Sequence, residues 1–599
     1  MCGIFVQITQ TDELSHRHPE ELSQRLREAN ATRPDARKSC CISLSRVFLE
    51  LFSSELRLRG NSPVIQPHQN ETGAILCWNG EIFAGLDVRA DENDGIKLFQ
   101  QLQSLETCEQ VRDLFASIEG PYAFVFYNAT AQKLFFSRDP LGRRSLLIHK
   151  PSVKNPYFLL ASVTAGSDPG YAFEELKTGH IHCLDIALLN KSNDIVSAFD
   201  EPAKINSTLP PDDLPVQLPV HNLDVIPAWL EEPVERLISQ LDHSVMLQVR
   251  DIPQDLSLKG QSRVAVLFSG GIDSTVLTLL ADRHLPRDEP IDLLNVAFEN
   301  PRKIKLQKEG NINPNKKKSK HKTFESRNGS NDVDSDTSIL SDYMVPDRVT
   351  GLQEVEELRR LCPERVWNFV EINVPYHESL IARSRVEGLM NPVRTVMDLS
   401  LALALYFASR GVGQVRSNPT DEPVPYTSPA RVLINGLGSD ELLGGYGRHR
   451  SAYKTGGWAA VIEEVCVLTL TSYWSRYSIP TSYRFRASTH SSCIQLQLEI
   501  DRIPVRNLGR DDRVISSHGK ETRHPFLSLD AVSFLADLPV QHKMDPRLPL
   551  GVGDKMLLRL AARKLGLVEA SGRKKRAMQF GSHSARMEGD ERGDKVLEG

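Results

Sequence analysis

The sequence predicts two joined folds, an α+β domain of antiparallel sheets with helices and then an α/β domain built on a parallel sheet. In the first third of the chain, short runs with β character alternate with turn signals. Beyond about residue 228, apolar strands alternate with helical stretches, a pattern that places helices on both faces of a parallel sheet. The 599 residues are too many for one hydrophobic core, which favours two or three domains.

The first domain is expected over residues 2–200. One helical stretch, DGIKLFQQLQ, interrupts its strands. A polar, proline-rich segment, STLPPDDLPVQLPVHN, then indicates a linker over 201–227. The expected strands are CCISLS, AILCWNG, YAFVFYN, KLFFSRD, FLLASV and HIHCLDI.

The second domain is expected over residues 228–599. It opens with the helical stretch PAWLEEPVERLISQLDHSVMLQV, after which RVAVLFSGG is typical of an apolar strand entering a glycine turn. Two further strands, IDLLNVAF and ARVLING, are separated by helical segments such as DLSLALALYFAS. Because ligands bind at the carboxyl ends of strands in such sheets, the turn after the first strand is a candidate site.

Two stretches break the pattern of the second domain and are expected insertions, at about 301–342 and 466–493. The first is charged, polar and nearly free of aromatics, so it cannot bury enough apolar surface to order itself. Its KKKSKHK run is interpreted as a solvated loop face, with a nuclear address as the alternative. The second mixes serine, tyrosine and arginine without a clean period.

The composition excludes several classes of protein. A net charge of -5 gives no global signature of nucleic-acid binding, and no apolar run approaches the ~20 residues needed to span a bilayer. The nine cysteines form no CxxC pair, which argues against a zinc site and against a disulfide framework. We therefore expect a reducing, cytoplasmic setting, with neither nucleic acid nor membrane as a partner.

The chain begins MCGIF, so removal of the initiator methionine would leave Cys2 with a thiol and a free α-amine. A thiolate is a nucleophile, and a terminal amine of pKa ~7.7–8.0 can accept the thiol proton. Attack on an amide carbonyl also needs hydrogen-bond donors for the developing oxyanion. In WNGEIF, the Asn79 side-chain amide and the Gly80 backbone N–H are candidates, with a hairpin turn at Asn-Gly as the alternative.

The segment SGGIDS, residues 269–274, follows VAVLF and leads into the helical STVLTLLADR. Consecutive backbone N–H groups in such a glycine turn cradle phosphate oxygens. A Walker loop would require a lysine that is missing here. The segment is similar to the pyrophosphate loop of enzymes that transfer AMP to a carbonyl oxygen, and Asp273 is a candidate Mg²⁺ ligand. The residues expected to hold the phosphates of ATP are Ser269, Gly270, Gly271, Asp273 and Ser274.

Taken together, MCGI, WNGEIF and RDPLGRRSLL resemble the glutamine amidotransferase domain of the class II, N-terminal-nucleophile type. The resemblance implies that Cys2 attacks the side-chain amide of glutamine and releases ammonia. It also implies that Asn79 and Gly80 form the oxyanion hole. The glutamine-binding residues that it implies are Glu81, Asp94 in the END tripeptide, and Arg57 in LRLRGN, where the serine of the family's Arg-Leu-Ser motif is absent.

INGLGSDELLGGYGRH and RDDRVISSHGKETRHPFL resemble the synthetase domain of the glutamine-hydrolysing asparagine synthetase family, and several other segments resemble its subgroup of asparagine synthetase domain-containing proteins. Lys555 and Lys575 are twenty residues apart, like two family lysines that act on ATP and on the adenylated intermediate. A basic surface cluster is the alternative for Lys575. Asp440 is implied as the second Mg²⁺ carboxylate beside Asp273. The remaining implied ATP contacts are Leu267, Val296, Asn435 and Gly436.

One position departs from the family signature Gly-Glu-Gly-Ser-Asp-Glu. This chain reads GLGSDE, with Leu437 in place of the first glutamate. Leucine can neither accept a proton nor bind an ammonium group. The arginine of the same family pocket also lacks a clean counterpart, because Arg394 is displaced from the expected register.

The sequence thus predicts a glutamine-dependent asparagine synthetase. Glutamine is hydrolysed at Cys2, ammonia crosses an internal tunnel, and aspartate is adenylated and amidated to asparagine with release of AMP and pyrophosphate. The expected cofactors are ATP and Mg²⁺, the expected partners are glutamine, aspartate and ATP, and a homodimer is compatible with the family. Two alternatives stay open: amidation of another carboxylate, and a regulatory or binding protein with a degenerate synthetase site. RNA-base modification is disfavoured by the acidic balance and by the lack of a CxxC pair.

Overall fold

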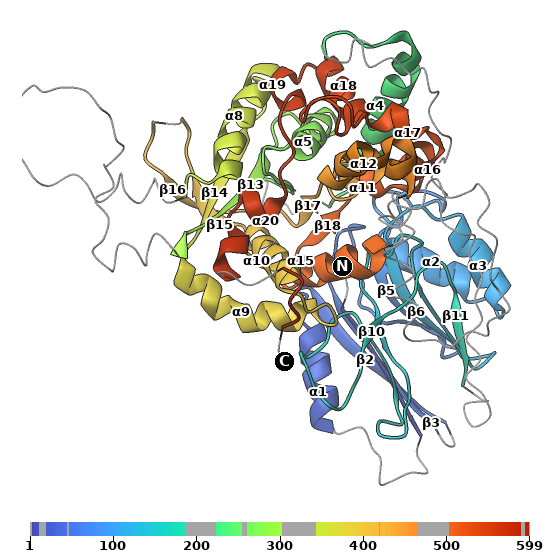
Figure 1. Ribbon diagram of the computed structural model, residues 1–599. Coiled ribbons are helices and arrows are strands. Elements are labelled where there is room, and N and C mark those ends of the chain that lie inside the picture. Colours follow the sequence, from blue (N-terminus) through green and yellow to red (C-terminus); the bar gives the residue numbers. More distant parts are fainter. Residues whose placement is uncertain are drawn as a thin grey trace, which may run out of the picture.

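The computed structural model describes residues 3–10, 20–44, 47–186, 223–253, 260–301, 343–418, 420–463, 502–588 and 593–597 (Figure 1). Cys2, most of the expected linker and, apart from residue 301, both expected insertions lie outside the described residues. No helix of the described residues is both long and apolar enough to cross a membrane.

The N-terminal domain contains two antiparallel sheets, with the strand orders β10-β8-β9-β1-β3-β2 and β11-β7-β6-β5-β4. The strands are β1 (Gly3–Gln10), β2 (Ala36–Ser43), β3 (Val47–Glu55), β4 (His68–Gln69), β5 (Ile75–Gly80), β6 (Tyr122–Asn128), β7 (Lys133–Arg138), β8 (Leu147–His149), β9 (Phe158–Ala161), β10 (Glu174–Glu175) and β11 (His182–Asp185). The helices are α1 (Glu20–Asn30), α2 (Asp94–Leu102) and α3 (Cys108–Ala116).

The two sheets of this domain stack face to face between helices (Figure 1). Alternate residues of β1 point in opposite directions, as the two-residue period of a strand requires. Ile4 and Val6 therefore pack against β5 of the other sheet, while Phe5 packs against α1 on the outer face. Helices α2 and α3 cover the outer face of the second sheet through an aromatic-rich core. The result is a four-layered domain, helix–sheet–sheet–helix.

The C-terminal domain is built on one sheet of seven strands in the order β16-β15-β14-β13-β12-β17-β18. The strands are β12 (Val264–Leu267), β13 (Ile291–Phe298), β14 (Trp367–Val374), β15 (Val412–Val415), β16 (Val424–Thr427), β17 (Val432–Ile434) and β18 (Glu521–Arg523). The helices are α4 (Ala228–Val249), α5 (Ile272–His284), α8 (Pro346–Leu361), α9 (Tyr376–Met390), α10 (Val396–Arg410), α11 (Ser439–Leu443), α12 (Gly447–Glu463), α15 (Gly509–Ser516), α16 (Leu529–Asp537), α17 (Val540–Lys543), α18 (Met556–Lys564), α19 (Val568–Ser571) and α20 (Met578–Gly581). Short helical turns of other types are η3 (Pro504–Leu508), η4 (Pro525–Leu527) and η5 (Ser584–Glu588).

This sheet lies between two helical layers, and each layer has its own apolar core. Helices α5 and α8 cover one face, with α4 and α18 packed behind them. Helices α9, α10 and α15 cover the other face. Strand β13, IDLLNVAF, is buried along its whole length, as expected for a strand enclosed on both faces.

The strand order creates a topological switch point in the second sheet. From β12 the chain moves outward through β13 and β14, and it later returns to add β17 and β18 on the other side of β12. The connections after β12 and β17 therefore diverge at the carboxyl ends of these strands. A crevice between them is the usual position of a ligand in an open α/β sheet.

The predicted fold class is confirmed, with one refinement. Strands β14, β13, β12, β17 and β18 are parallel, but β15 and β16 form an antiparallel edge that the sequence pattern did not indicate. Each expected β run overlaps a strand of the structure, and DGIKLFQQLQ forms α2.

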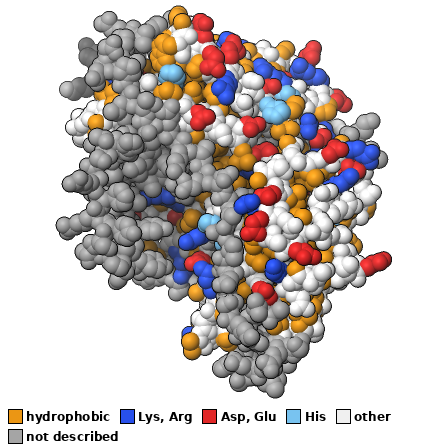
Figure 2. Space-filling view, turned by 90° about the vertical axis from the view of Figure 1, so that its right-hand side faces the viewer, with side chains coloured by type: hydrophobic (Ala, Val, Ile, Leu, Met, Phe, Trp, Pro, Cys, Tyr) orange, Lys and Arg blue, Asp and Glu red, His pale blue; other side chains and the backbone are white. Residues whose placement is uncertain are grey.

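On the face drawn in Figure 2, acidic and basic side chains are interspersed over the described surface. Neither sign gathers into one broad patch on this face.

Candidate active sites

The predicted oxyanion segment stands at the end of β5. Asn79 and Gly80 are the last two residues of this strand and pair with β6. The hairpin alternative is therefore wrong, because both residues belong to a paired strand. A Cβ on Gly80 would lie 2.7 Å from Trp78 Cζ2, so the position accommodates only glycine.

Cys2 lies outside the described residues, and Gly3, which follows it, opens β1. A Cβ on Gly3 would lie 2.0 Å from the carbonyl oxygen of Asn30, so α1 closely confines the backbone at this point. Strand β1 packs against β5, which carries the oxyanion segment.

Glu81 and Asp94, the two acidic residues that the resemblance assigns to glutamine binding, lie beside that segment. Asp94 Oδ2 accepts the Ile82 amide at 3.0 Å and the Trp78 indole N–H at 3.4 Å. Burial raises the pKa of Asp94, and Arg59 opposes this shift. Burial, together with the carboxylates of Glu521 and Asp94, also raises the pKa of Glu81.

The structure does not bring Arg57 to this group. The Arg57 side chain pairs with Glu55, and Arg57 lines a separate cavity of about 340 Å³. Arg59, two residues further on, has its Nε 3.5 Å from Glu81 Oε2 and donates from Nη2 to Ile82 O at 2.7 Å. LRLRGN offers both arginines, and burial of Arg59 distinguishes it from Arg57.

The SGGIDS segment forms a tight turn between β12 and α5. Gly271 caps α5, and its amide donates to Ser269 Oγ at 3.2 Å. Gly270 has φ +73°, and a Cβ there would lie 2.5 Å from the Gly351 amide nitrogen. Asp273 and Ser274 follow in the first turn of α5. This turn has the backbone N–H groups and the helix N-terminus that an anionic phosphate needs.

The loop after β17 faces this turn across the switch point. Asn435 Oδ1 accepts the Leu437 amide at 3.1 Å, which holds the loop folded. A Cβ on Gly436 would lie 2.9 Å from Asp273 Cβ, so the two walls approach closely here. Asp440 stands in the first turn of α11.

Lys555 joins the two walls. Its Nζ lies 2.6 Å from Asp273 Oδ2, 2.8 Å from Asp440 Oδ1 and 3.0 Å from Ser439 Oγ. Lys555 is fully buried and has φ +52°, a conformation that residues other than glycine rarely adopt. Burial opposes ionisation, but the carboxylates of Asp273 and Asp440 raise the pKa of Lys555.

Lys575 approaches from the other side. Its Nζ lies 3.3 Å from Asp440 Oδ2 and 5.0 Å from the centre of the Tyr446 ring. Burial acts against ionisation of Asp440, yet Lys555 and Lys575 together lower its pKa. Lys575 thus contacts a predicted site residue, so the alternative of a basic surface cluster is not needed.

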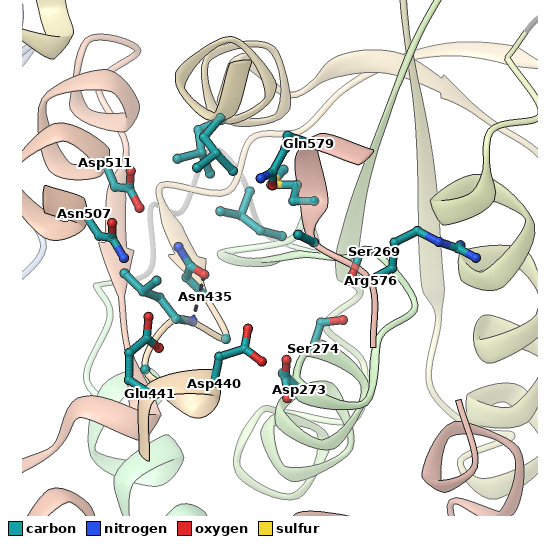
Figure 3. A pocket seen from close by; sticks show the side chains of 18 of the residues that line it. Ser269, Asp273, Ser274, Asn435, Asp440, Glu441, Asn507, Asp511, Arg576 and Gln579 are labelled. Carbon is teal, nitrogen blue, oxygen red and sulfur yellow. Dashed lines mark hydrogen bonds between the residues drawn. The ribbon is translucent and has the colours of Figure 1, made fainter. Parts of the chain in front are cut away.

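These residues border a cavity of about 390 Å³ (Figure 3). Ser269, Asp273 and Ser274 come from one wall, and Asn435 and Asp440 from the other. A third wall is apolar and is formed by Leu267, Leu294, Val296, Met397, Leu401 and Leu405. The polar groups predicted to bind phosphate thus border the same cavity as an apolar surface suited to a flat base. Gly270, Gly271 and Lys555 are not among the residues that line the cavity.

Sequence reasoning missed several residues at the far end of this cavity. Arg510 pairs there with Asp398 at 2.6 Å and with Asp511 at 2.7 Å. Tyr446 Oη donates to Glu441 Oε1 at 2.6 Å, and burial and the charge of Asp440 raise the pKa of Glu441. RDDRVISSHG and the GSDELLGGY segment resemble segments of the family, but no local pattern in either indicates that they meet in the fold. Leu437 also lines the cavity, whereas Arg394 does not.

The donor set suits Mg²⁺ bound together with a nucleotide. Among the residues that the structure describes, no group of three or more histidine, cysteine or carboxylate side chains could hold a metal alone. Mg²⁺ needs only one or two carboxylates when substrate phosphates complete its coordination. Asp273 and Asp440 supply two, and their shared contact with the Lys555 ammonium marks the position as one for positive charge.

Comparisons with known proteins match two parts of the chain to two domain families. An asparagine synthase family profile matches residues 255–311 and 426–594, and a glutamine amidotransferase domain profile matches residues 53–165. The human protein named asparagine synthetase domain-containing protein 1 is 35% identical, with 90% of this chain and 88% of the human protein covered. An asparagine synthetase domain-containing protein of Saccharomyces cerevisiae is 30% identical, with 91% and 86% covered. Asparagine synthetase [glutamine-hydrolyzing] 1 of the same yeast is 25% identical, with 47% of this chain and 44% of the yeast protein covered.

The fold and the matching profiles define a glutamine amidotransferase domain of the N-terminal-nucleophile class followed by an asparagine synthase domain. The chain belongs to the asparagine synthetase family, in its subgroup of asparagine synthetase domain-containing proteins.

We predict that Lys555→Met strongly destabilises the chain at pH 8. The substitution leaves Asp273 and Asp440 without their shared ammonium group, and breaking a buried ion pair in this way costs ~3–5 kcal/mol. Lys564→Met is the matched control, because Lys564 ends the helix that Lys555 precedes, is partly exposed and pairs with Glu235 at the surface. Thermal denaturation should show a clear loss for Lys555→Met and little change for Lys564→Met. Equal melting temperatures for the two variants would contradict the bridging role.

A second prediction concerns Asp347, which lines the cavity and whose pKa burial raises to about 7. Because this pKa lies above the unfolded value of ~3.9, the wild-type chain loses stability as pH rises from about 4 to about 7. Asp347→Asn has no ionisable group at this position, so its stability does not fall with pH for this reason. Its melting temperature relative to wild type should therefore increase between pH 5 and pH 7 and level off above that. The exposed Asp113→Asn should show no such trend, and a flat difference for Asp347→Asn would refute the assignment.

Proposed function

We propose that the chain is a glutamine-dependent amidotransferase that makes asparagine. Glutamine and water give glutamate and ammonia in the N-terminal domain. Aspartate and ATP give aspartyl-AMP and pyrophosphate in the C-terminal domain, and ammonia then displaces AMP to form asparagine. The family supports the two half-reactions, and the choice of aspartate is the default that the resemblance supplies.

In the first half-reaction, Cys2 is the proposed nucleophile and its own α-amine the proposed base. The Asn79 side chain and the Gly80 amide would donate to the oxyanion, at a strand end where no side chain fits on residue 80. Asp94 would hold the ammonium group of glutamine, with Glu81 beside it. The α-carboxylate of glutamine needs a cationic partner. Arg59 is a stronger candidate for this contact than Arg57, because Arg59 already lies 3.5 Å from Glu81.

In the second half-reaction, the SGGIDS turn would bind the pyrophosphate of ATP and the apolar wall would bind adenine. Asp273 and Asp440 would hold Mg²⁺, which neutralises phosphate charge when bound. Lys555 and Lys575 would place positive charge beside the phosphates, since both contact Asp440. Fixed charge of this kind stabilises the negative charge that develops during adenylation.

The observation that carries the proposal is the Asp273–Lys555–Asp440 bridge at the switch point. It brings together residues 273, 440 and 555 from three separate segments that the family resemblance singled out independently. The bridge lies beside the turn that the resemblance assigned to pyrophosphate.

Leu437 favours a second candidate, amidation of a carboxylate other than that of aspartate. It lines the cavity and adds an apolar surface where the family signature has an acid. Glu441, Asp511 and Asn507 also line the cavity (Figure 3). An acceptor with an apolar group next to its carboxylate would fit Leu437 better than the short, charged aspartate.

The test is pyrophosphate release by the purified full chain with glutamine, Mg-ATP and aspartate. We expect release that depends on aspartate, and glutamate formation that falls at least ~100-fold in Cys2→Ala because the nucleophile is lost. Cys77→Ala is the control, since Cys77 is a buried core residue. Pyrophosphate release only with another carboxylic acid would favour the second candidate. Glutamate formation that survives in Cys2→Ala would reject the glutaminase assignment.

A further inference from the structure

Arg523 has two ends that contact different candidate sites. Its backbone carbonyl oxygen accepts the Asn435 amide at 2.9 Å, in the loop that borders the nucleotide cavity. Its side chain extends into the other domain, where Nη2 lies 3.6 Å from Glu81 Oε1 and the guanidinium lies over the Phe83 ring. One residue thus connects the predicted ATP loop to the predicted glutamine segment.

The side chain of Arg523 is held firmly in this position. It is 3% exposed, Nε donates to Glu521 Oε1 at 2.6 Å, and Nη1 donates to the carbonyl oxygen of Gln248. Glu521 in turn contacts Arg144 of the first domain at 3.0 Å, and Arg144 also donates to Thr522 O at 2.9 Å. Strand β18 is therefore tied to the first domain through the buried charges of Glu521 and Arg523, which lie on one face of the strand.

Glu81 is held from two directions. Arg59 of its own domain lies against one carboxylate oxygen and Arg523 of the other domain lies against the second. Arg59 also pairs with Asp251 of the second domain at 2.9 Å. A small displacement of Arg523 would change the charge environment of Glu81, because buried charges are screened much less than exposed ones.

We propose that Arg523 is a positioning residue that couples nucleotide binding to glutamine binding. Contacts of Mg-ATP with the Asn435 loop are transmitted to β18 through the Asn435–Arg523 hydrogen bond, and a shift of Arg523 changes the charge environment of Glu81. Glutamine therefore binds more tightly when Mg-ATP is bound. By linkage, glutamine strengthens Mg-ATP binding by the same factor. The inference rests on the proposed function of the two sites.

The test measures the KM for glutamine with and without saturating Mg-ATP, in wild type and in Arg523→Lys. Couplings of this kind change affinity by about 5-fold or more, so we expect Mg-ATP to lower the wild-type KM by at least about that factor. In Arg523→Lys, the ratio of the glutamine KM without Mg-ATP to the glutamine KM with Mg-ATP should fall toward one. Lysine cannot contact Glu81, Glu521 and Gln248 together. A general loss of structure would instead lower kcat without changing the ratio.

Arg513→Lys is the matched control. Arg513 is also a buried interdomain arginine, with Nη1 2.6 Å from Glu175 Oε1 and 2.8 Å from Ser145 Oγ, but it contacts neither Glu81 nor the Asn435 loop. For Arg513→Lys, the ratio of the glutamine KM without Mg-ATP to that with Mg-ATP should equal the wild-type ratio. A wild-type ratio of one, or an Arg523→Lys ratio equal to wild type, would overturn the proposal.

Calorimetry in the Cys2→Ala background separates the proposal from the proposed function. Glutamine is not turned over there, so the Kd of Mg-ATP can be measured with and without glutamine. A several-fold tighter Kd with glutamine that disappears on adding Glu81→Gln or Arg523→Lys supports the coupling even if no asparagine is made. An unchanged Kd overturns the coupling even if wild type makes asparagine.

Discussion

A buried lysine between two carboxylates organises the second domain. Lys555 lies at the start of α18, Asp273 in the first turn of α5 and Asp440 in the first turn of α11, so one ammonium group draws three helices to the carboxyl end of the sheet. Without this ammonium group, the two carboxylates that it contacts would repel each other. Lys555 has a left-handed backbone conformation, so the arrangement is accompanied by backbone strain. The cavity at the switch point, its apolar wall and the facing loop lie around this bridge.

Local sequence signals predicted the fold class and the strand–turn–helix arrangement at SGGIDS well. The strand RVAVLFSGG and its helix are contiguous, and β13 is apolar throughout because helices cover both of its faces. The antiparallel edge formed by β15 and β16 could not be read from the same pattern, since its residues are largely exposed and carry no strong alternation.

The site residues that escaped prediction depend on long-range packing. Asp398 on α10 and Arg510 on α15 meet only because both helices cover the same face of the sheet. The choice between Arg57 and Arg59 depends on which of them is buried against Glu81, and nothing in LRLRGN encodes that contact. The resemblance supplied Lys555 and Asp440, but their shared bridge to Asp273 is visible only in three dimensions.

The two ends of the cavity have different characters. At the phosphate end, paired charges and glycine turns leave little freedom, as the close approach of Gly436 to Asp273 illustrates. At the proposed acceptor end, Glu441 and the Arg510 ion pairs line the cavity, and the lining residues also include the apolar Leu437 and Ile503. This division fits the second proposed function, in which the adenylation chemistry is kept and the acceptor is a carboxylate other than aspartate.

The central claim, that ATP binds at the switch point between β12 and β17, is tested most directly by photolabelling the full chain with 8-azido-ATP in the presence of Mg²⁺. The label should be displaced by ATP and should attach to peptides of the apolar wall, from residues 264–298 or 396–410. Attachment elsewhere in the chain, or labelling that excess ATP does not displace, would contradict the claim.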